Sequence, residues 1–181
     1  MKYDVIYADP PWCYGEGTAI TPNSYSKSHY NVEKWQDIKE IPVKNISNDD
    51  CVLFLWATGP HLQHAFEVMN SWGFTYSTMG FVWDKQKPVV GHYTMSSTEF
   101  CLIGKKGKIP APRGARNVRQ FLSAKRGKHS TKPEEIASRI NDMFPHQNKV
   151  ELFARKRRKG WDCLGDALTG KDIRKELDET I

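Results

Sequence analysis

The sequence predicts an α/β fold with a mostly parallel central sheet and helices on both of its faces. Short apolar runs alternate along the chain with segments of helical composition, as in folds where helices connect successive strands. Several of these runs are continuously apolar, which is expected of strands that are covered on both faces. With 181 residues, 39% of them hydrophobic, residues 1–181 fit a single domain with a full core.

Runs of aliphatic and aromatic residues mark the predicted strands. They are 3–8 (YDVIYA), 51–56 (CVLFLW), 74–83 (FTYSTMGFVW), 98–103 (TEFCLI) and 149–154 (KVELFA). The predicted helices are 31–37, 60–71, 133–143 and 171–179. Pro60 and Pro133 suit a first helical turn, and Gly73 suits a helix stop. The tryptophans at 56, 72 and 83 are expected to build the core.

Positive charge is concentrated in one segment of the chain. The formal net charge is +6, and residues 105–128 alone hold nine Lys or Arg and no Asp or Glu. Gly, Pro, Ser and Lys without a clear period predict a basic loop at 105–130, inserted in the single domain. Such a loop is either a solvated surface segment or, through Arg113, Arg116 and Arg119, a contact for nucleic-acid phosphates.

Cysteine usage and hydropathy limit where the protein works. The four cysteines have no CxxC spacing, which is typical of a reduced protein inside the cell. The chain begins with no signal-peptide pattern, and no apolar run approaches the roughly 18 residues of a membrane span. We therefore expect a soluble cytoplasmic protein, in the host cytoplasm if it is phage-encoded. His61 and His64 are expected to decorate a helix face, and no metal is predicted.

The tetrapeptide Asp9-Pro10-Pro11-Trp12 directly follows the first predicted strand. Ligands in open α/β sheets bind just beyond the carboxyl ends of strands, so Asp9 is well placed to contact one. The two prolines fix their φ angles and form a stiff turn with carbonyl acceptors, while Trp12 offers a flat face for a nucleobase. By itself, the pattern favours the simpler interpretation, a turn that ends a strand beside a packed tryptophan.

Further motifs follow in an order that resembles the DPPW-type N6-adenine methyltransferases of the MT-A70 family. The matching blocks are ADPPW at 8–12, VLFLWATGP at 52–60, GHYTMSSTEFCLIGKKG at 91–107, HSTKPEEI at 129–136, ELFAR at 151–155 and GWDCLGD at 160–166. The resemblance covers roughly residues 3–168. It implies a Rossmann-like methyltransferase fold with permuted motifs, in which the catalytic motif precedes the cofactor motif.

The same resemblance implies methyl transfer from S-adenosylmethionine to the N6 amine of adenine. The Asp9 carboxylate and the Pro10 carbonyl would accept the two N–H groups of the amine, favouring the charged transition state. Trp12 would stack on the adenine, with Tyr30 as a second wall. An adenine inside a duplex would have to be flipped out to reach this turn.

The resemblance also implies the cofactor contacts. Lys132 would pair with the methionine carboxylate, Arg155 and Asp166 would contact the ribose and adenosine end, and Asp9 belongs to the same set. Asp166-Ala167 stands where the catalytic subunit of the messenger-RNA writer has Asn-Gln. Independently of the resemblance, Glu99 lies just inside a predicted strand and is a candidate buried functional acid.

Three functions stay open. A DNA adenine methyltransferase is favoured, because this single small domain lacks the extensions of RNA-modifying relatives. RNA methylation and a catalytically inactive nucleic-acid-binding partner are the alternatives, and the intact DPPW and Lys132 argue against the second of these. A monomer and a homodimer are both compatible with the sequence. Selection of the target base is expected from the loops at 13–30, 84–97 and 105–130, whose composition predicts no target sequence.

Overall fold

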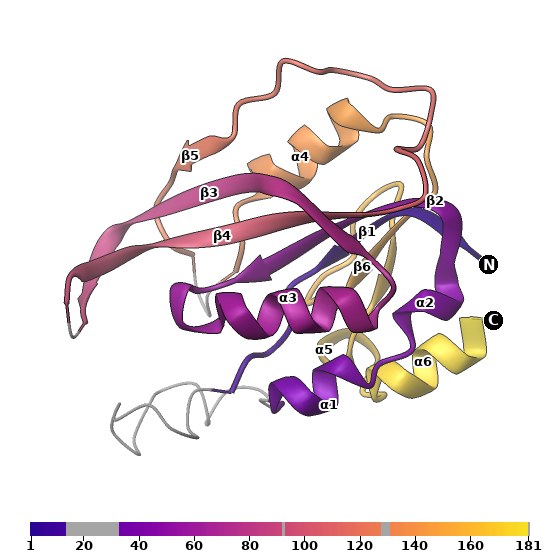
Figure 1. The fold of residues 1–181 in the computed structure, drawn as a ribbon, viewed down its shortest axis with the longest axis horizontal. Coiled ribbons are helices and arrows are strands. Elements are labelled where there is room, and N and C mark those ends of the chain that lie inside the picture. The colour runs from indigo at the N-terminus through magenta and orange to yellow at the C-terminus, as the bar shows by residue number, and fades with distance from the viewer. Residues whose placement is uncertain (14–32, 92, 128–130, 181) are drawn as a thin grey trace.

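The computed structural model describes residues 1–13, 33–91, 93–127 and 131–180, and Figure 1 shows their arrangement. In chain order the elements are β1 (Tyr3–Ala8), α1 (Trp35–Lys39), α2 (Val43–Ile46), β2 (Ser47–Ala57), the 3-10 turn η2 (Gly59–His61), α3 (Leu62–Ser71), β3 (Thr75–Val90), β4 (Met95–Lys106), β5 (Phe121–Ser123), α4 (Glu134–Met143), β6 (Lys149–Leu152), β7 (Asp162–Leu164), α5 (Asp166–Thr169) and α6 (Ile173–Thr180).

The strands form one mixed sheet with the order β5-β3-β4-β2-β1-β6-β7. β1 is parallel to both β2 and β6, β6 is parallel to β7, and β3 is parallel to β5. β4 is antiparallel to both of its neighbours, β2 and β3. It is therefore the reversed strand of a sheet in which the others run the same way, and the predicted Rossmann-like α/β class is confirmed.

Helices cover both faces of this sheet. Figure 1 shows α4 on one side and α1, α3 and α6 on the other. On the side of α3 the core includes Val68, Met69 and Trp72, together with Ile38 of α1 and Leu177 of α6. This burial on both faces explains why the central strands read as continuous apolar runs.

The α4 side has a core of its own, in which Ile136 and Ile140 pack beside Phe144. These side chains recur at positions i and i+4 and form the apolar face of α4. Trp56 and Trp83 contribute to the same cluster, and Trp72 to the opposite one. The three tryptophans are buried, as predicted.

Three regions differ from the sequence-based expectation. β3 and β4 are longer than predicted, and their outer residues pair with each other as a two-stranded arm. The sequence does not indicate this extension, because the outer residues have no buried face and therefore no apolar pattern. The segment 105–130 is not a loop throughout, since β4 runs to Lys106 and β5 lies within it. The short elements α2, β7 and α5 were not predicted, because three or four residues carry no readable period.

Some predictions fall partly or wholly outside the described residues. The predicted helix at 31–37 corresponds to α1 only from Trp35, since 14–32 are not described. None of the helices in the described ranges is long and apolar enough to cross a membrane.

Candidate active site

Asp9 lies at the carboxyl end of β1, in the middle of the parallel part of the sheet. β1 lies between β2 and β6, and its last residue pairs with Leu55 on one side and Leu152 on the other. A cavity of about 80 Å³ opens at this edge. It is lined by Asp9, Pro10, Pro11, Trp12, Trp56, Ala57, Thr58, Glu99, Lys132 and Arg155. The predicted catalytic turn and two of the predicted cofactor residues, Lys132 and Arg155, therefore meet in one cavity.

Lys132 joins two carboxylates in this cavity. Its Nζ lies 2.7 Å from Asp9 Oδ1 and 3.1 Å from Glu99 Oε2. The three side chains are largely shielded from water, with exposed fractions of 23% for Asp9, 11% for Lys132 and 7% for Glu99. Lys85 Nζ lies 3.2 Å from the other oxygen of Glu99. The four residues form a chain of alternating charge, which we call the charged network.

Burial and pairing shift the pKa values of this network in different directions. Burial raises the pKa of Asp9, and the Lys132 ammonium opposes this shift without cancelling it. Burial also works against ionisation of Glu99, but Lys132 and Lys85 together outweigh it and lower the pKa of that carboxyl group. Burial disfavours the Lys132 ammonium, yet Asp9 and Glu99 raise its pKa. Asp9 is therefore the carboxyl group of the pair that takes up a proton more readily.

Glu99 reaches the site because β4 runs against the parallel strands. Ala57, the last residue of β2, pairs with Phe100 of β4, so Glu99 lies just beyond the carboxyl end of β2. Because β4 runs in the opposite direction, its first residues lie at the same edge of the sheet as the last residues of the parallel strands. The sequence marked Glu99 as a candidate acid, but it offered no signal for Lys85, which lies on β3.

The turn at 10–12 is held by its own hydrogen bonds. The Trp12 backbone N–H donates to the Pro10 carbonyl (2.9 Å), and the Glu33 N–H donates to the Pro11 carbonyl (2.9 Å). The two carbonyl acceptors of the turn are therefore each engaged once. Because a carbonyl oxygen has two lone pairs, the Pro10 oxygen can still accept a second N–H.

Trp12, the last residue of the turn, packs against η2. Its indole N–H donates to the Trp56 carbonyl (2.9 Å), and its ring stacks on His61 with the centroids 5.5 Å apart. The ring is only 7% exposed. A nucleobase could stack on Trp12 only over the face that His61 leaves open, so this role stays a prediction. Tyr30, the predicted second wall, lies outside the described residues.

His61 is buried and links two parts of the site. Its Nδ1 lies 3.0 Å from Thr58 Oγ1, and its Nε2 lies 3.2 Å from the Cys13 carbonyl. A carbonyl can only accept, so Nε2 carries the proton and Nδ1 accepts from Thr58. Burial lowers the pKa of His61, in keeping with a neutral ring. His64 stacks on Trp35 instead, and the described part of the chain contains no cluster of three or more His, Cys, Asp or Glu suited to a metal.

Asp166 lies at the same edge of the sheet but apart from the cavity. It begins α5 directly after β7, and β7 is separated from β1 by β6. Its side chain is exposed. Arg155 follows β6 and lies between the two positions, so Asp9, Arg155 and Asp166 are spread along three neighbouring strand ends, while Lys132 precedes α4.

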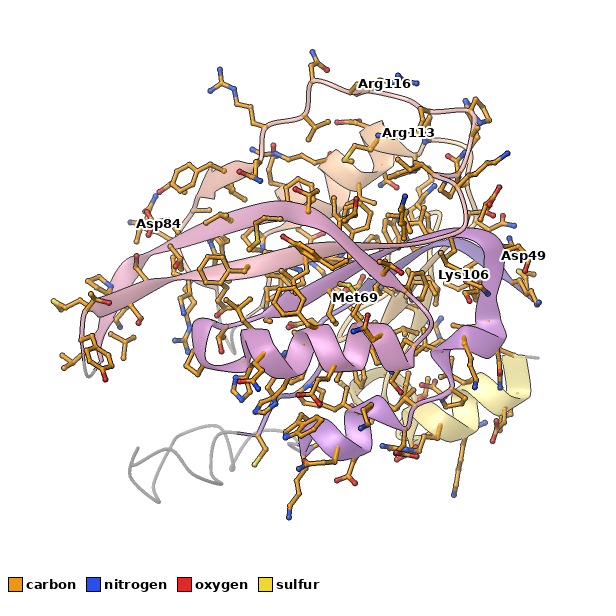
Figure 2. All side chains as sticks on the ribbon, in the orientation of Figure 1. Asp49, Met69, Asp84, Lys106, Arg113 and Arg116 are labelled. Carbon is orange, nitrogen blue, oxygen red and sulfur yellow. The ribbon has the colours of Figure 1, made fainter. Side chains whose placement is uncertain are left out.

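Arg113 and Arg116 lie on a segment that crosses α4 (Figure 2). The Gly114 and Ala115 N–H groups donate to the Met143 and Asp142 carbonyls at the end of α4, over 3.0 and 2.7 Å. The Arg113 guanidinium lies 4.8 Å from the centroid of the Phe144 ring, and burial lowers its pKa. Arg113 is therefore part of the packing.

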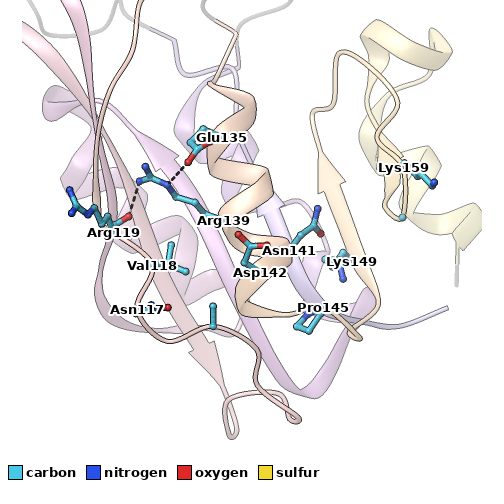
Figure 3. A pocket seen from close by; sticks show the side chains of 12 residues that line it. Asn117, Val118, Arg119, Glu135, Arg139, Asn141, Asp142, Pro145, Lys149 and Lys159 are labelled. Atoms are coloured by element: carbon cyan, nitrogen blue, oxygen red, sulfur yellow. Dashed lines mark hydrogen bonds and ion pairs between the residues drawn. The ribbon is translucent and has the colours of Figure 1, made fainter.

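A second, larger hollow of about 930 Å³ lies beside α4, and Figure 3 shows the residues that line it. Arg119 lies on one wall, and its carbonyl accepts a hydrogen bond from Arg139 (2.8 Å). Arg139 is also paired with Glu135 at 3.1 Å. We call this hollow the α4 groove; the charged network does not contribute to its lining.

A mostly parallel sheet with an acidic turn and a buried lysine at its carboxyl edge is typical of an α/β enzyme of the Rossmann-like class. The family comparison is more specific: the model of the MT-A70 family matches residues 3–167. The chain therefore belongs to the MT-A70 family, and it is a methyltransferase of the S-adenosylmethionine-dependent class.

Individual relatives agree with this assignment. The chain is 46% identical over 179 residues to the type II methyltransferase M.MunI of Mycoplasma sp, an alignment that covers 91% of this chain and 77% of that protein. It is 28% identical to the human N(6)-adenosine-methyltransferase catalytic subunit METTL3 and 27% identical to an MT-A70-like N(6)-adenosine-methyltransferase of Arabidopsis thaliana. These alignments cover 93% of this chain but only 29% and 24% of those longer proteins.

Proposed function

We propose that the protein transfers a methyl group from S-adenosylmethionine to the N6 amino group of adenine in DNA. The observation that carries this proposal is the position of Asp9. It lies at the carboxyl end of the central strand, next to a proline carbonyl and in contact with a buried lysine. Carboxylate and carbonyl acceptors side by side suit an amine with two N–H groups.

The chemistry of the amine explains why such acceptors matter. The lone pair of an exocyclic adenine amine is delocalised into the ring, so its attack on a methyl group places positive charge on the nitrogen. Acceptors that contact both N–H groups stabilise that charge more than the planar ground state. Asp9 Oδ2 and the second lone pair of the Pro10 carbonyl would serve this purpose. The proton that leaves the product nitrogen can pass to Asp9, whose pKa burial raises.

The residues of the cavity fit the reacting end of the cofactor. S-adenosylmethionine supplies an electrophilic methyl group on a sulfonium centre when it is bound. Lys132 has three N–H donors, two of which are directed at Asp9 and Glu99, which leaves one for a carboxylate of the cofactor. Arg155 lines the same cavity, and Asp166 would accept from the ribose hydroxyls farther along the edge. A hollow of about 80 Å³ is smaller than typical ligand pockets of about 300 Å³ or more, so it would hold the reacting groups alone.

DNA is the proposed substrate because the relative of highest identity among those described is a type II methyltransferase, at 46% against 28% for METTL3. The basic character of the chain suits either nucleic acid. RNA is therefore the second candidate, favoured by the methyltransferases of adenosine among the relatives. The proposal includes no metal and leaves the protein a monomer or a homodimer.

The test is to incubate the purified protein with labelled S-adenosylmethionine and either unmethylated plasmid DNA or transcribed RNA, and then to digest the product to nucleosides. We expect labelled N6-methyldeoxyadenosine from DNA and a lower yield from RNA. Asp9→Ala is the matched inactive variant. Equal label with wild type and Asp9→Ala would refute the mechanism, and label in RNA alone would move the substrate assignment to the second candidate.

A further inference from the structure

β3 and β4 continue past the sheet as an arm with an apolar tip. Figure 1 shows the arm reaching beyond the other strands, on the side where β1 ends. Its outer side chains are exposed, at 52% for Val89, 82% for Val90, 100% for Tyr93 and 62% for Met95. Apolar side chains that cluster on a projecting element are unusual on a soluble surface and mark an interaction site.

The charge of the arm indicates what it contacts. Residues 85–98 contain Lys85 and Lys87 and no Asp or Glu. Lys85 is paired with Glu99 at the base of the arm, so Lys87 carries the positive charge that lies toward the apolar tip. A short hairpin with an apolar tip and a positive charge beside it is suited to a polyanion with an apolar interior. A nucleic-acid duplex has this character, because phosphates line its outside and stacked bases fill its inside.

The base of the arm is fixed to the reaction centre. Asp84 pairs with Thr98, but the next pair is Val89 with Ser96, so the four residues 85–88 lie opposite a single residue of β4. This bulge is pinned by Asp84, which accepts from the Gln86 N–H (3.1 Å) and from Ser123 Oγ of β5 (2.9 Å). Bulges of this kind bend a strand and redirect its side chains.

Within the bulge, Lys85 turns back to Glu99. Glu99 in turn contacts Lys132, which contacts Asp9. The arm and the proposed reacting group are therefore connected through consecutive ion pairs. A molecule that binds the arm therefore lies at the edge of the sheet where Asp9 is found.

From these observations we infer that the arm is a wedge for duplex DNA. Val90, Tyr93 and Met95 insert between stacked base pairs, while Lys87 contacts a neighbouring phosphate. Proteins that bend or open DNA insert apolar side chains in this way, and unstacking costs a few kcal/mol per step. The wedge thus unstacks an adenine that has to leave the helix before it can reach Asp9. This inference rests on the proposed function and adds how a duplex substrate would be opened.

The test uses the exposed tip, where substitution leaves the core intact. In the wedge variant, Val90→Ser, Tyr93→Ala and Met95→Ser are combined. The matched control is Ile109→Ala, an apolar residue that is 48% exposed and follows β4 at the opposite edge of the sheet. Closed circular DNA is relaxed by a topoisomerase in the presence of saturating protein, and the change in linking number is measured. This measurement requires neither a known target sequence nor methyl transfer.

We expect wild type and Ile109→Ala to shift the linking number equally, and the wedge variant to reduce the shift at least fivefold at equal saturation of the DNA. No shift with wild type, or the same shift with the wedge variant, would overturn the inference. A second copy of this chain is the competing occupant of the tip. If sedimentation shows a wild-type dimer that becomes a monomer in the wedge variant, the tip is a dimer contact and the wedge is wrong.

A failure of the wedge can be distinguished from a failure of the proposed methyl transfer. Methyl transfer is measured on duplex DNA and on the same DNA after denaturation. If the wedge is right, the variant loses transfer to the duplex at least tenfold and retains transfer to single strands. If neither nucleic acid is methylated by wild type, the proposed function fails, while the linking-number measurement still decides the wedge.

Discussion

The charged network at the carboxyl edge and the basic segment over α4 hold charge in opposite ways. In the network, each of the four side chains contacts a partner of opposite sign, and Asp9, Glu99 and Lys132 line one cavity. Over α4, Arg113 packs on an aromatic ring and Arg116 is exposed. The comparison teaches that a high local charge count alone does not identify a binding site, whereas charges that meet in a cavity at the carboxyl edge of the sheet are stronger evidence for one.

The largest effect is expected at Asp9. Asp9→Asn keeps the shape of the side chain but removes its charge, so methyl transfer should fall about 100- to 1000-fold, the usual loss for one transition-state contact. Because burial raises the pKa of Asp9, the wild-type rate should rise with pH through a pKa above the ordinary carboxyl value. Single-turnover rates across pH measure both effects.

Asp178→Asn is the control for this prediction, since Asp178 is exposed on α6. Its rate and pH profile should match wild type. A pH profile of Asp9→Asn that retains the same low-pH limb would show that another group titrates.

The next largest effect is expected at Lys132. Lys132→Met leaves two buried carboxylates facing each other, and the free energy of unfolding should fall by about 3 kcal/mol, as for other broken buried ion pairs. Adding Glu99→Gln removes one of the uncompensated charges and should recover part of this loss. Denaturant unfolding of the single and double variants measures the coupling.

Lys175→Met on the exposed part of α6 controls for a general loss of positive charge and should unfold like wild type. Strictly additive losses in Lys132→Met and Glu99→Gln would contradict the charged network. Cofactor affinity of the folded Lys132→Met protein should also decrease, which isothermal titration detects.

A smaller effect is expected from the basic segment. Changing the exposed Arg116 and Arg119 together to Glu should weaken DNA binding about tenfold or more at low salt, because phosphate contacts are lost, and should reduce the slope of affinity against salt. Cofactor affinity should not change. Fluorescence anisotropy over a salt titration measures the binding, and identical curves for the variant and wild type would exclude this surface.

A second pair of charge reversals compares basic residues near the edge of Asp9 with those over α4. Lys125 and Arg126 follow β5, whose last residues pair with β3 beside the base of the arm. Reversing these two should cost more binding per charge than reversing Arg116 and Arg119, because they lie nearer the edge where Asp9 is found. Arg113 is left unchanged here, since its substitution also disturbs Phe144.

The smallest effect is expected at His61. The folded protein holds this ring neutral by lowering its pKa below the ordinary 6.5, so the unfolded chain binds the proton more readily. Stability should therefore decrease as pH falls below about 6.5, the ordinary pKa of histidine. His61→Gln should flatten this dependence and cost about 1 kcal/mol through the lost hydrogen bonds. Thermal unfolding between pH 5 and 8 measures it, with His146→Gln as the control.

Much of the fold could be predicted because its strands and helices have clear periods. The predicted first strand has the bounds of β1, and the predicted helices at 60–71 and 133–143 correspond to α3 and α4. The arm could not be predicted, because exposed strands that pair only with each other lack an apolar face. Likewise β5 lies in a stretch of mixed polarity, and only its pairing with β3 makes it a strand.

The candidate site was partly predictable for a chemical reason. Asp9 and Lys132 belong to local motifs that are readable in sequence, and the structure brings them within 2.7 Å. Lys85 carried no such signal, because its position follows from the bulge and from the reversed direction of β4. The stacking of Trp12 on His61 was also invisible, since these residues are far apart in sequence.

By itself, the sequence determined the fold class, the family resemblance and the acidic turn at the end of the first strand, because each depends on short local motifs or on their order along the chain. Only the tertiary structure decided which charges meet. The ion pairs of Lys132 with Asp9 and Glu99 require that β1, the reversed β4 and the start of α4 converge on one edge of the sheet. The position of the apolar tip beside that edge follows from the same arrangement, since the direction of β3 and the bulge at 85–88 set where the arm points.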